Sequence, residues 1–322
     1  MSEWSGLPGT RKKEADTLPD FLFQVSGEKR SGEGEDSYYY SCTKRQVVLA
    51  VFDGCGGSGA RRYDRFQFHT GAYMASRTVA GAVRDWAETL RSGSGSGQAG
   101  NAKTLKRGVQ EYLEICRREG CSAGRLSGSL LKSFPTTMAM VVSNDGQEYS
   151  CYWAGDSRCY LLDGQGLRQL TRDDTGDADA MENLLNSGRM TNVISAEKDF
   201  VIHQKKISVS KPCIVFAATD GCFGYVSSPM EFEWLLLETL MHSSGPADWE
   251  TQITAALKRI SGDDFTLCGA AYGFGSFEAL VNTCAARHTD LKSRYIAGIE
   301  GKSITEKRQV WEQYRAEYEA YL

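Results

Sequence analysis

The stretch that decides the fold is VVLAVFDGCGGSGARR, residues 47–62. An apolar, strand-like run ends at Asp53, and three of the next four residues are glycine. The same pattern returns in CIVFAATDG, residues 213–221, which ends in Asp220 and Gly221. A single Asp-Gly pair after an apolar run is typical of a turn. Two such pairs, together with further lone aspartates at strand ends, indicate a chemical role.

Five segments place an acidic residue where an apolar strand meets turn residues: GEGEDSYYY (Asp36), VFDGCGG (Asp53), YWAGDSRCY (Asp156), AATDGCFG (Asp220) and SGDDFTL (Asp263). Each aspartate could merely open a turn. Carboxylates gathered at one end of a sandwich would repel each other, and divalent cations relieve that repulsion. Oxygen ligands without Cys or His pairs favour Mg²⁺ or Mn²⁺. We therefore expect the glycines to clear space around an ion, with the Gly54 carbonyl in reach of it.

Composition excludes several classes of protein. The net charge of −4 argues against an extended nucleic-acid surface. No apolar run approaches the roughly 18 to 20 residues of a membrane span, and the N-terminal segment lacks the apolar core of a secretion signal. The ten cysteines are scattered without a CxxC pair, which argues against a disulfide framework or a zinc site. We expect a cytoplasmic protein that binds neither nucleic acid nor membrane.

The pattern of elements indicates an α+β protein. Short strand-like runs separated by turn residues predict antiparallel hairpins, and helical stretches are expected at about 63–90, 103–119, 229–242 and 247–260. The simplest arrangement is a four-layer αββα sandwich, two antiparallel sheets flanked by helices. We expect a flexible arm over residues 1–18, the main domain over 19–274 and a helical C-terminal extension over 275–322.

The extension is predicted to form two helices, the second with aromatic residues at helical spacing, including Trp311, Tyr314 and Tyr318. This stripe can dock onto the main domain or form a partner-binding surface, and both interpretations stay open.

The ordered motifs ED, VFDGCGG, TT, GDSR, LTRDD, ATDG and DDFT, spread over residues 21–272, resemble the metal-dependent serine/threonine protein phosphatases of the type 2C class, in a variant like the bacterial members. The resemblance implies an αββα sandwich that holds two Mn²⁺ or Mg²⁺ ions, with a weaker third site. A bridging water would attack phosphoserine or phosphothreonine monoesters.

Carried over by position, the resemblance implies that Asp53 is catalytic and bridges both metals, with Gly54 contributing its carbonyl. Asp220 and Asp263 would ligate one metal, and Asp36 would hold the other through water. The resemblance also assigns Asp156 to the third metal and Glu35 to the outer shell around Asp36.

Four positions depart from the family pattern. Cys55 stands where relatives carry His or Met, so a water would have to protonate the leaving group. Alternatively, Cys55 is a redox-sensitive thiol. Ser31 occupies the slot of a phosphate-binding Arg, which makes neighbouring Arg30 the candidate for this catalytic role, unless it is a solvated surface charge. Asp264 replaces a common Asn, and Asp174, expected to be a turn residue, replaces a frequent His.

Residues 172–199 correspond to the family's variable flap. Its acidic residues would favour basic phosphopeptides or keep a mobile loop solvated. The expected function is a monomeric phosphatase acting on phosphorylated Ser/Thr proteins and opposing a Ser/Thr kinase. The alternatives are a catalytically silent pseudophosphatase that binds a phosphoprotein or serves as a scaffold, and a phosphatase of small molecules; no Walker-type loop supports nucleotide recognition.

Overall fold

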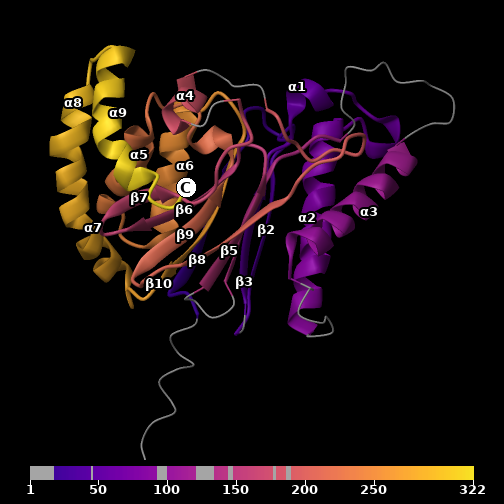
Figure 1. Ribbon diagram of the computed structural model, residues 1–322, viewed down its shortest axis with the longest axis horizontal. Coiled ribbons are helices and arrows are strands. Elements are labelled where there is room, and N and C mark those ends of the chain that lie inside the picture. Colours follow the sequence, from indigo (N-terminus) through magenta and orange to yellow (C-terminus); the bar gives the residue numbers. More distant parts are fainter. Residues whose placement is uncertain are drawn as a thin grey trace, which may run out of the picture.

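The computed structural model describes residues 18–44, 46–92, 100–120, 134–143, 148–176, 179–185 and 190–322. Two five-stranded antiparallel sheets pack face to face, with strand orders β1-β10-β9-β6-β7 and β2-β3-β4-β5-β8 (Figure 1). The strands are β1 (Phe21–Gly27), β2 (Ser37–Cys42), β3 (Val47–Phe52), β4 (Met138–Ser143), β5 (Glu148–Ala154), β6 (Arg158–Asp163), β7 (Gly166–Gln169), β8 (His203–Ser208), β9 (Cys213–Ala218) and β10 (Phe265–Tyr272).

Helices cover the outer face of each sheet. They are α1 (Gly56–Gly59), α2 (Gly71–Ser92), α3 (Ala102–Gly120), α4 (Ala180–Leu185), α5 (Pro229–Met241), α6 (Pro246–Ile260), α7 (Phe277–Leu291), α8 (Ala297–Ile299) and α9 (Ile304–Tyr318), with short turns η1 (Asp64–Phe66) and η2 (Asp220–Cys222) and a π-helical turn η3 (Lys292–Ile296). In Figure 1, α2 and α3 flank the sheet that contains β3, while α5, α6, α7 and α9 lie on the side of β9. The predicted four-layer sandwich is confirmed.

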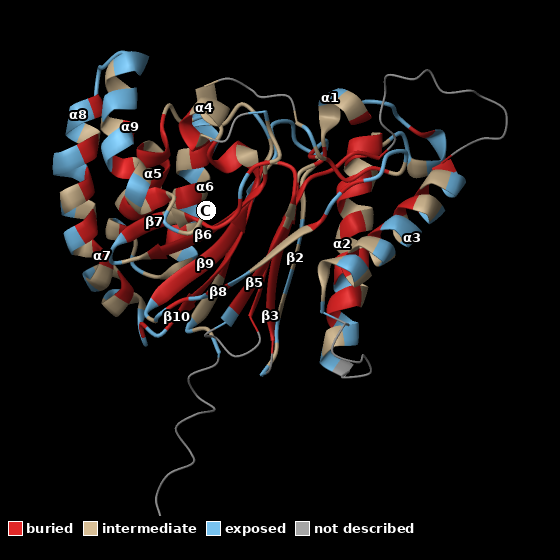
Figure 2. Cartoon of the chain, in the orientation of Figure 1, coloured by how far each residue is buried: buried red, intermediate tan, exposed pale blue. Residues whose placement is uncertain are grey.

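Three layers of apolar packing hold the sandwich together, one between the sheets and one under each helical layer. Every residue of β3 and of β9 is buried, because one face of each strand meets the other sheet and the opposite face meets helices. This accounts for the continuous apolar runs VVLAVF and CIVFAA, which lack the alternation of a half-exposed strand. Figure 2 shows buried residues across both sheets and on the helix faces turned toward them.

One helix prediction is wrong. The helix expected over residues 63–90 begins only at Gly71, and the hairpin that precedes it closes through a bridge between Arg62 and Thr70. Gln67 and Phe68 have φ of 53° and 62°, which a right-handed helix cannot accommodate. The helix expected at 103–119 is α3, and the two expected at 229–242 and 247–260 are α5 and α6, each within one residue at either end.

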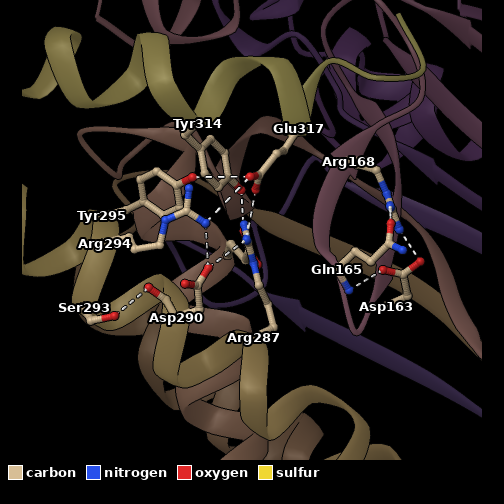
Figure 3. A network of polar contacts seen from close by, with 11 residues as sticks. Asp163, Gln165, Arg168, Arg287, Asp290, Ser293, Arg294, Tyr295, Tyr314 and Glu317 are labelled. Carbon is tan, nitrogen blue, oxygen red and sulfur yellow. Dashed lines mark hydrogen bonds and ion pairs between the residues drawn. The ribbon is translucent and has the colours of Figure 1, made fainter.

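The C-terminal helices dock onto the main body. Trp311, Tyr314 and Tyr318 on α9 are buried in the same apolar cluster as residues of α5 and α6. A buried ion pair joins Arg287 of α7 to Glu233 of α5, and Arg287 also reaches Glu317 of α9 (Figure 3). The aromatic stripe therefore packs inward and is covered.

The flexible arm expected over residues 1–18 falls almost entirely outside the described residues, because only Leu18 of it is described. Over the part of the chain that the structure describes, no helix is both long and apolar enough for a membrane span. Among the described residues, none of the nine cysteines forms a disulfide, and seven of them are buried, which is typical of cysteine as a small apolar residue.

Candidate functional site

The predicted acidic residues surround one cavity of about 670 Å³ at the end of the sandwich where β3 and β9 terminate. Its lining includes Glu35, Asp53, Asp156, Asp220 and Asp263. These residues come from the β1–β2 loop, the end of β3, the β5–β6 turn, the end of β9 and the turn before β10. Segments far apart in the sequence are thus brought to one place.

Asp36 lies beside this cavity. It lines a second cavity of about 330 Å³, which shares Asp264 with the first. Its carboxylate contributes to the electrostatic environment of Asp53, so the two side chains are close enough to interact. Thr219, at the end of β9, donates from Oγ1 to Asp36 Oδ2 at 2.8 Å, which fixes the carboxylate against the opposite sheet.

The backbone at Asp53 is held by two threonines that directly precede the neighbouring strand β4. Thr136 donates from Oγ1 to the Asp53 carbonyl at 2.6 Å, and the Thr137 N–H donates to the same oxygen at 2.8 Å. Thr137 Oγ1 also lies 2.6 Å from Ser157 Oγ, next to Asp156. Two segments that carry acidic residues are therefore tied together beneath the cavity.

Gly54 and Gly221, which follow Asp53 and Asp220, are required for a different reason from the one expected. A Cβ on Gly54 would lie 2.7 Å from the carbonyl oxygens of Glu35 and Ala72, and one on Gly221 would collide with the Asp264 carbonyl. Each glycine is needed because another backbone segment passes against it. They let the loops that carry the acidic residues meet, and the space beside them is filled by protein backbone.

Asp264 organises the β1–β2 loop. Its Oδ1 accepts from the Lys29 N–H at 2.7 Å, and its Oδ2 accepts from the Glu35 N–H at 2.6 Å. The Glu35 side chain in turn accepts from Thr70 Oγ1, at the start of α2. In the sequence, Asp264 stood out only as a replacement of a common Asn; in the structure its carboxylate holds the loop that presents Glu35 and Asp36.

Burial and mutual repulsion dominate the electrostatics. Burial raises the pKa of Asp53 well above its usual range, and Asp220, Asp36, Asp156 and Asp263 raise it further. Burial and the charge of Asp220 raise the pKa of Asp156 to about 8, and burial and the charge of Asp263 raise that of Asp220 to about 6. Each added negative charge disfavours ionisation of the others. The cavity is therefore short of positive charge.

The donor set fits a hard divalent cation. The lining carboxylates offer oxygen ligands, and Asp156 Oδ1 is buried without a hydrogen-bond partner in the described structure. Within the described ranges, no group of three or more Asp, Glu, His or Cys side chains forms a compact cation site. The carboxylates thus surround the cavity without converging on one point, as expected for like charges.

Basic residues stand at the mouth of the cavity. Arg30 lines it, but its side chain is 78% exposed and pairs with Glu33 at 3.8 Å. Lys29 also lines the mouth, as does Arg62, which sequence reasoning missed. Arg62 lies just before the segment expected to be helical, and its bridge to Thr70 brings it to the cavity.

Several acidic residues of the flap form hydrogen bonds or ion pairs with basic residues of the protein. Asp173 makes two hydrogen bonds with buried Arg158, at 2.9 and 2.6 Å. Asp179 pairs with Arg315 of α9 at 2.9 Å, and Glu182 pairs with Arg308 at 2.7 Å.

Asp174 is more than the expected turn residue. Its Oδ2 accepts from the Gly155 N–H at 3.0 Å and from Asn192 at 2.6 Å, and its Oδ1 contacts His203 at 2.8 Å. Because Asp173, Asp174, Asp179 and Glu182 are engaged in this way, neither a preference for basic phosphopeptides nor a solvated mobile loop describes them. Asp177 lies outside the described residues.

Comparison with known proteins identifies the fold. No protein-family model matches the chain, and no curated protein sequence matches it. The serine/threonine phosphatase Stp1 from Staphylococcus aureus is 19% identical, with a TM-score of 0.59 over 83% of this chain and 100% of that one. The Mycobacterium tuberculosis phosphatase PstP/Ppp is 17% identical, with a TM-score of 0.54 over 79% and 99%.

A PstP catalytic domain solved with two manganese ions is 19% identical and has a TM-score of 0.51 over 79% of this chain and 98% of that one. The chain therefore has the fold of these solved phosphatases, in agreement with the resemblance found in its sequence motifs.

Proposed function

We propose that this protein is a metal-dependent phosphatase that hydrolyses phosphoserine and phosphothreonine monoesters in proteins. The observation that carries the proposal is the gathering of Asp53, Asp156, Asp220 and Asp263 around one cavity, with Asp36 beside Asp53. Burying several carboxylates together is unfavourable unless positive charge joins them. The solved structures that share the fold carry the names of serine/threonine phosphatases, one of them with manganese bound.

In this proposal, oxygen atoms of residues around the cavity would hold two divalent ions. Asp53 would bridge them, with help from the Gly54 carbonyl; Asp220 and Asp263 would hold one ion, and Asp36 the other through water. Asp156 would serve a weaker third ion, and Glu35 would orient the shell around Asp36. Bound Mn²⁺ or Mg²⁺ supplies a water of lowered pKa and positive charge opposite the phosphate.

The basic residues at the mouth suit the incoming phosphate. Arg30, Lys29 and Arg62 all line the cavity, and a guanidinium can bind two phosphate oxygens at once. We assign the phosphate contact to Arg30, because its ion pair with Glu33 is exposed and can be exchanged for a phosphate. Such an enzyme would reverse the action of a Ser/Thr kinase in signalling.

The test is a metal-dependence assay on a phosphothreonine peptide and on p-nitrophenyl phosphate. We expect hydrolysis with Mn²⁺ or Mg²⁺, loss with EDTA, and a fall of at least a hundredfold in kcat for Asp53→Asn combined with Asp220→Asn. The matched control is Asp85→Asn, because Asp85 lies on α2 outside the cavity in an exposed ion pair with Arg84.

The possible outcomes separate the hypotheses. Full activity in the double variant would refute the proposal. Binding of Mn²⁺ without turnover of any phosphate ester would favour a silent phosphoprotein-binding module. Turnover of small phosphate esters with no activity on phosphopeptides would assign the site to a small-molecule substrate.

A further inference from the structure

The hairpin between α1 and α2 forms one side of the cavity mouth. It closes through the bridge between Arg62 and Thr70, and the Tyr63 N–H donates to the His69 carbonyl at 3.0 Å. The cavity lining includes Arg62, Gln67, Phe68, His69 and Thr70 from this segment. The hairpin follows closely after the Asp53 loop in the chain, and both segments line the cavity.

Two aromatic residues anchor the hairpin to the body of the protein. Tyr63 is buried and stacks on Phe134 with ring centroids 5.0 Å apart. Phe66 is half-buried and meets the same Phe134 ring edge-on at 6.3 Å. Arg65 donates to the Glu119 carbonyl near the end of α3 at 3.3 Å. The base of the hairpin is therefore fixed by packing.

Phe68 differs from both anchored rings. Its side chain is 62% exposed, the most exposed of the large apolar side chains in the described structure. It lies in the left-handed region with φ of 62°, directly after Gln67 with φ of 53°. Two successive bulky residues in this region are unusual, because each loses free energy in adopting it.

Hydrogen bonds hold this unfavourable turn in place. The Phe68 N–H donates to the Tyr63 carbonyl at 3.0 Å, and Arg62 Nη1 donates to the Phe68 carbonyl at 3.1 Å. The backbone around Phe68 is thus restrained while its ring is left largely in solvent at the cavity mouth. A solvent-exposed aromatic ring on a restrained backbone is a preformed contact for another apolar group.

We propose that Phe68 is a specificity-determining residue that contacts a bulky apolar side chain of the substrate, within a few residues of the phosphorylated Ser or Thr. This inference rests on the proposed phosphatase function. The occupant is a segment of phosphoprotein, since the ring shares one cavity with the carboxylates and with the basic residues Arg30 and Arg62. An extended peptide advances about 3.3 Å per residue, so a side chain near the phosphorylated residue reaches the rim.

The test uses two phosphothreonine peptides that differ only in flanking residues, with Leu and Phe in one and Ser in the other. We expect the wild type to favour the apolar peptide in kcat/KM by about tenfold, which is typical of one apolar side-chain contact. Phe68→Asn should bring this ratio close to one through KM, because Asn tolerates the left-handed backbone while lacking the ring. Phe68→Leu should restore part of the preference.

Ile115→Asn is the matched control, since Ile115 is an apolar residue of similar exposure on α3 that does not line the cavity. The kcat/KM ratio of Ile115→Asn for the two peptides should equal that of the wild type.

An unchanged ratio in Phe68→Asn, or a wild type that hydrolyses both peptides equally well, would overturn the inference while leaving the phosphatase function intact. If the wild type turns over neither peptide, the proposed function fails. Fluorescence anisotropy with the labelled peptides then decides: equal binding by wild type and Phe68→Asn overturns the docking role, and weaker apolar-peptide binding by the variant supports it.

Discussion

The ion pair between Arg287 and Glu233 allows a quantitative test of how the C-terminal helices dock. The exposed fraction of the two side chains is 5% and 0%, and Arg287 donates to Glu233 at 2.7 and 3.0 Å. Tyr314 of α9 donates to the same carboxylate, and Glu317 accepts from Arg287 at 2.9 Å (Figure 3). This network joins α5, α7 and α9.

Arg287→Met removes the positive charge and keeps most of the volume, which leaves the Glu233 carboxylate buried without its cation. Breaking one side of a buried pair costs about 3 to 5 kcal/mol. For a chain of this length we expect a fall in Tm of about 6 to 10 °C, at the lower end of the usual shift per kcal/mol. Urea denaturation measures the free energy, and thermal unfolding followed by circular dichroism measures the Tm.

Two further variants make the test specific. Arg294→Met removes an arginine of the same region whose ion pair with Asp290 is exposed, so its denaturation midpoint should barely change. Adding Glu233→Gln to Arg287→Met should recover part of the lost stability, because the buried charge disappears while an acceptor for Tyr314 remains. If Arg287→Met were as mild as Arg294→Met, or if Glu233→Gln deepened the loss, the docking described here would be wrong.

Three other predictions follow from the fold and the cavity. Gly221→Ala should lower the free energy of unfolding by about 1 to 3 kcal/mol in urea denaturation, because its Cβ meets the Asp264 carbonyl. Gly57→Ala should leave the free energy of unfolding unchanged, because a Cβ on Gly57 meets open space. Equal effects of the two substitutions would contradict the close approach at Gly221. A second prediction concerns the metal-free protein in EDTA, where folding raises the pKa of Asp220 to about 6. The folded state then binds more protons than the unfolded state, so the free energy of unfolding should fall as the pH rises from about 4 to 6. Asp220→Asn should therefore stabilise the metal-free protein at pH 7 by on the order of 3 kcal/mol and raise its Tm; a lower Tm would contradict the repulsion. Deleting residues 303–322 removes the three buried aromatic rings of α9, and burial of each ring contributes about 1.5 to 3 kcal/mol. We therefore expect the shortened chain to aggregate. An unchanged urea midpoint would show that α9 is dispensable for folding.

The layers and the meeting of the acidic residues could be predicted from the sequence, because both depend on local patterns. The runs ending at Asp53 and Asp220 are apolar throughout, which indicates strands buried on both faces. Acidic residues at the ends of such strands meet when the sheets pack face to face. The strand at 213–221 and the helix at 103–119 were therefore placed correctly, and the cavity lies where these patterns end.

The parts that could not be predicted depend on contacts between distant residues. The hairpin before α2 contains Phe66 and other apolar residues at roughly helical spacing, yet Tyr63 and Phe66 pack on Phe134, a residue far along the chain. The flap acids Asp179 and Glu182 find their partners on α9, more than a hundred residues later. Their charge alone gave no sign of that pairing.

Asp264 shows the same limit within the site. Its sequence position suggested only one more negative charge, but its two oxygens accept the backbone N–H groups of Lys29 and Glu35. An asparagine side chain offers a single carbonyl acceptor, whereas a carboxylate can accept both bonds. The departure from the family pattern at this position is thus explained by the loop it holds.

The cost of the crowded carboxylates also distinguishes an enzyme from a silent scaffold. Asp220 and Asp156 raise the pKa of Asp53, and Asp220 also raises that of Asp156. Arg158, a buried arginine near the cavity, is already engaged by Asp173. A chain that used this fold only to bind a partner would gain stability by replacing any of these carboxylates with a neutral residue. Retaining all of them is expected where the repulsion is offset by bound cations during function. The same substitution should therefore stabilise the metal-free protein and abolish its activity, and a scaffold would show only the first effect.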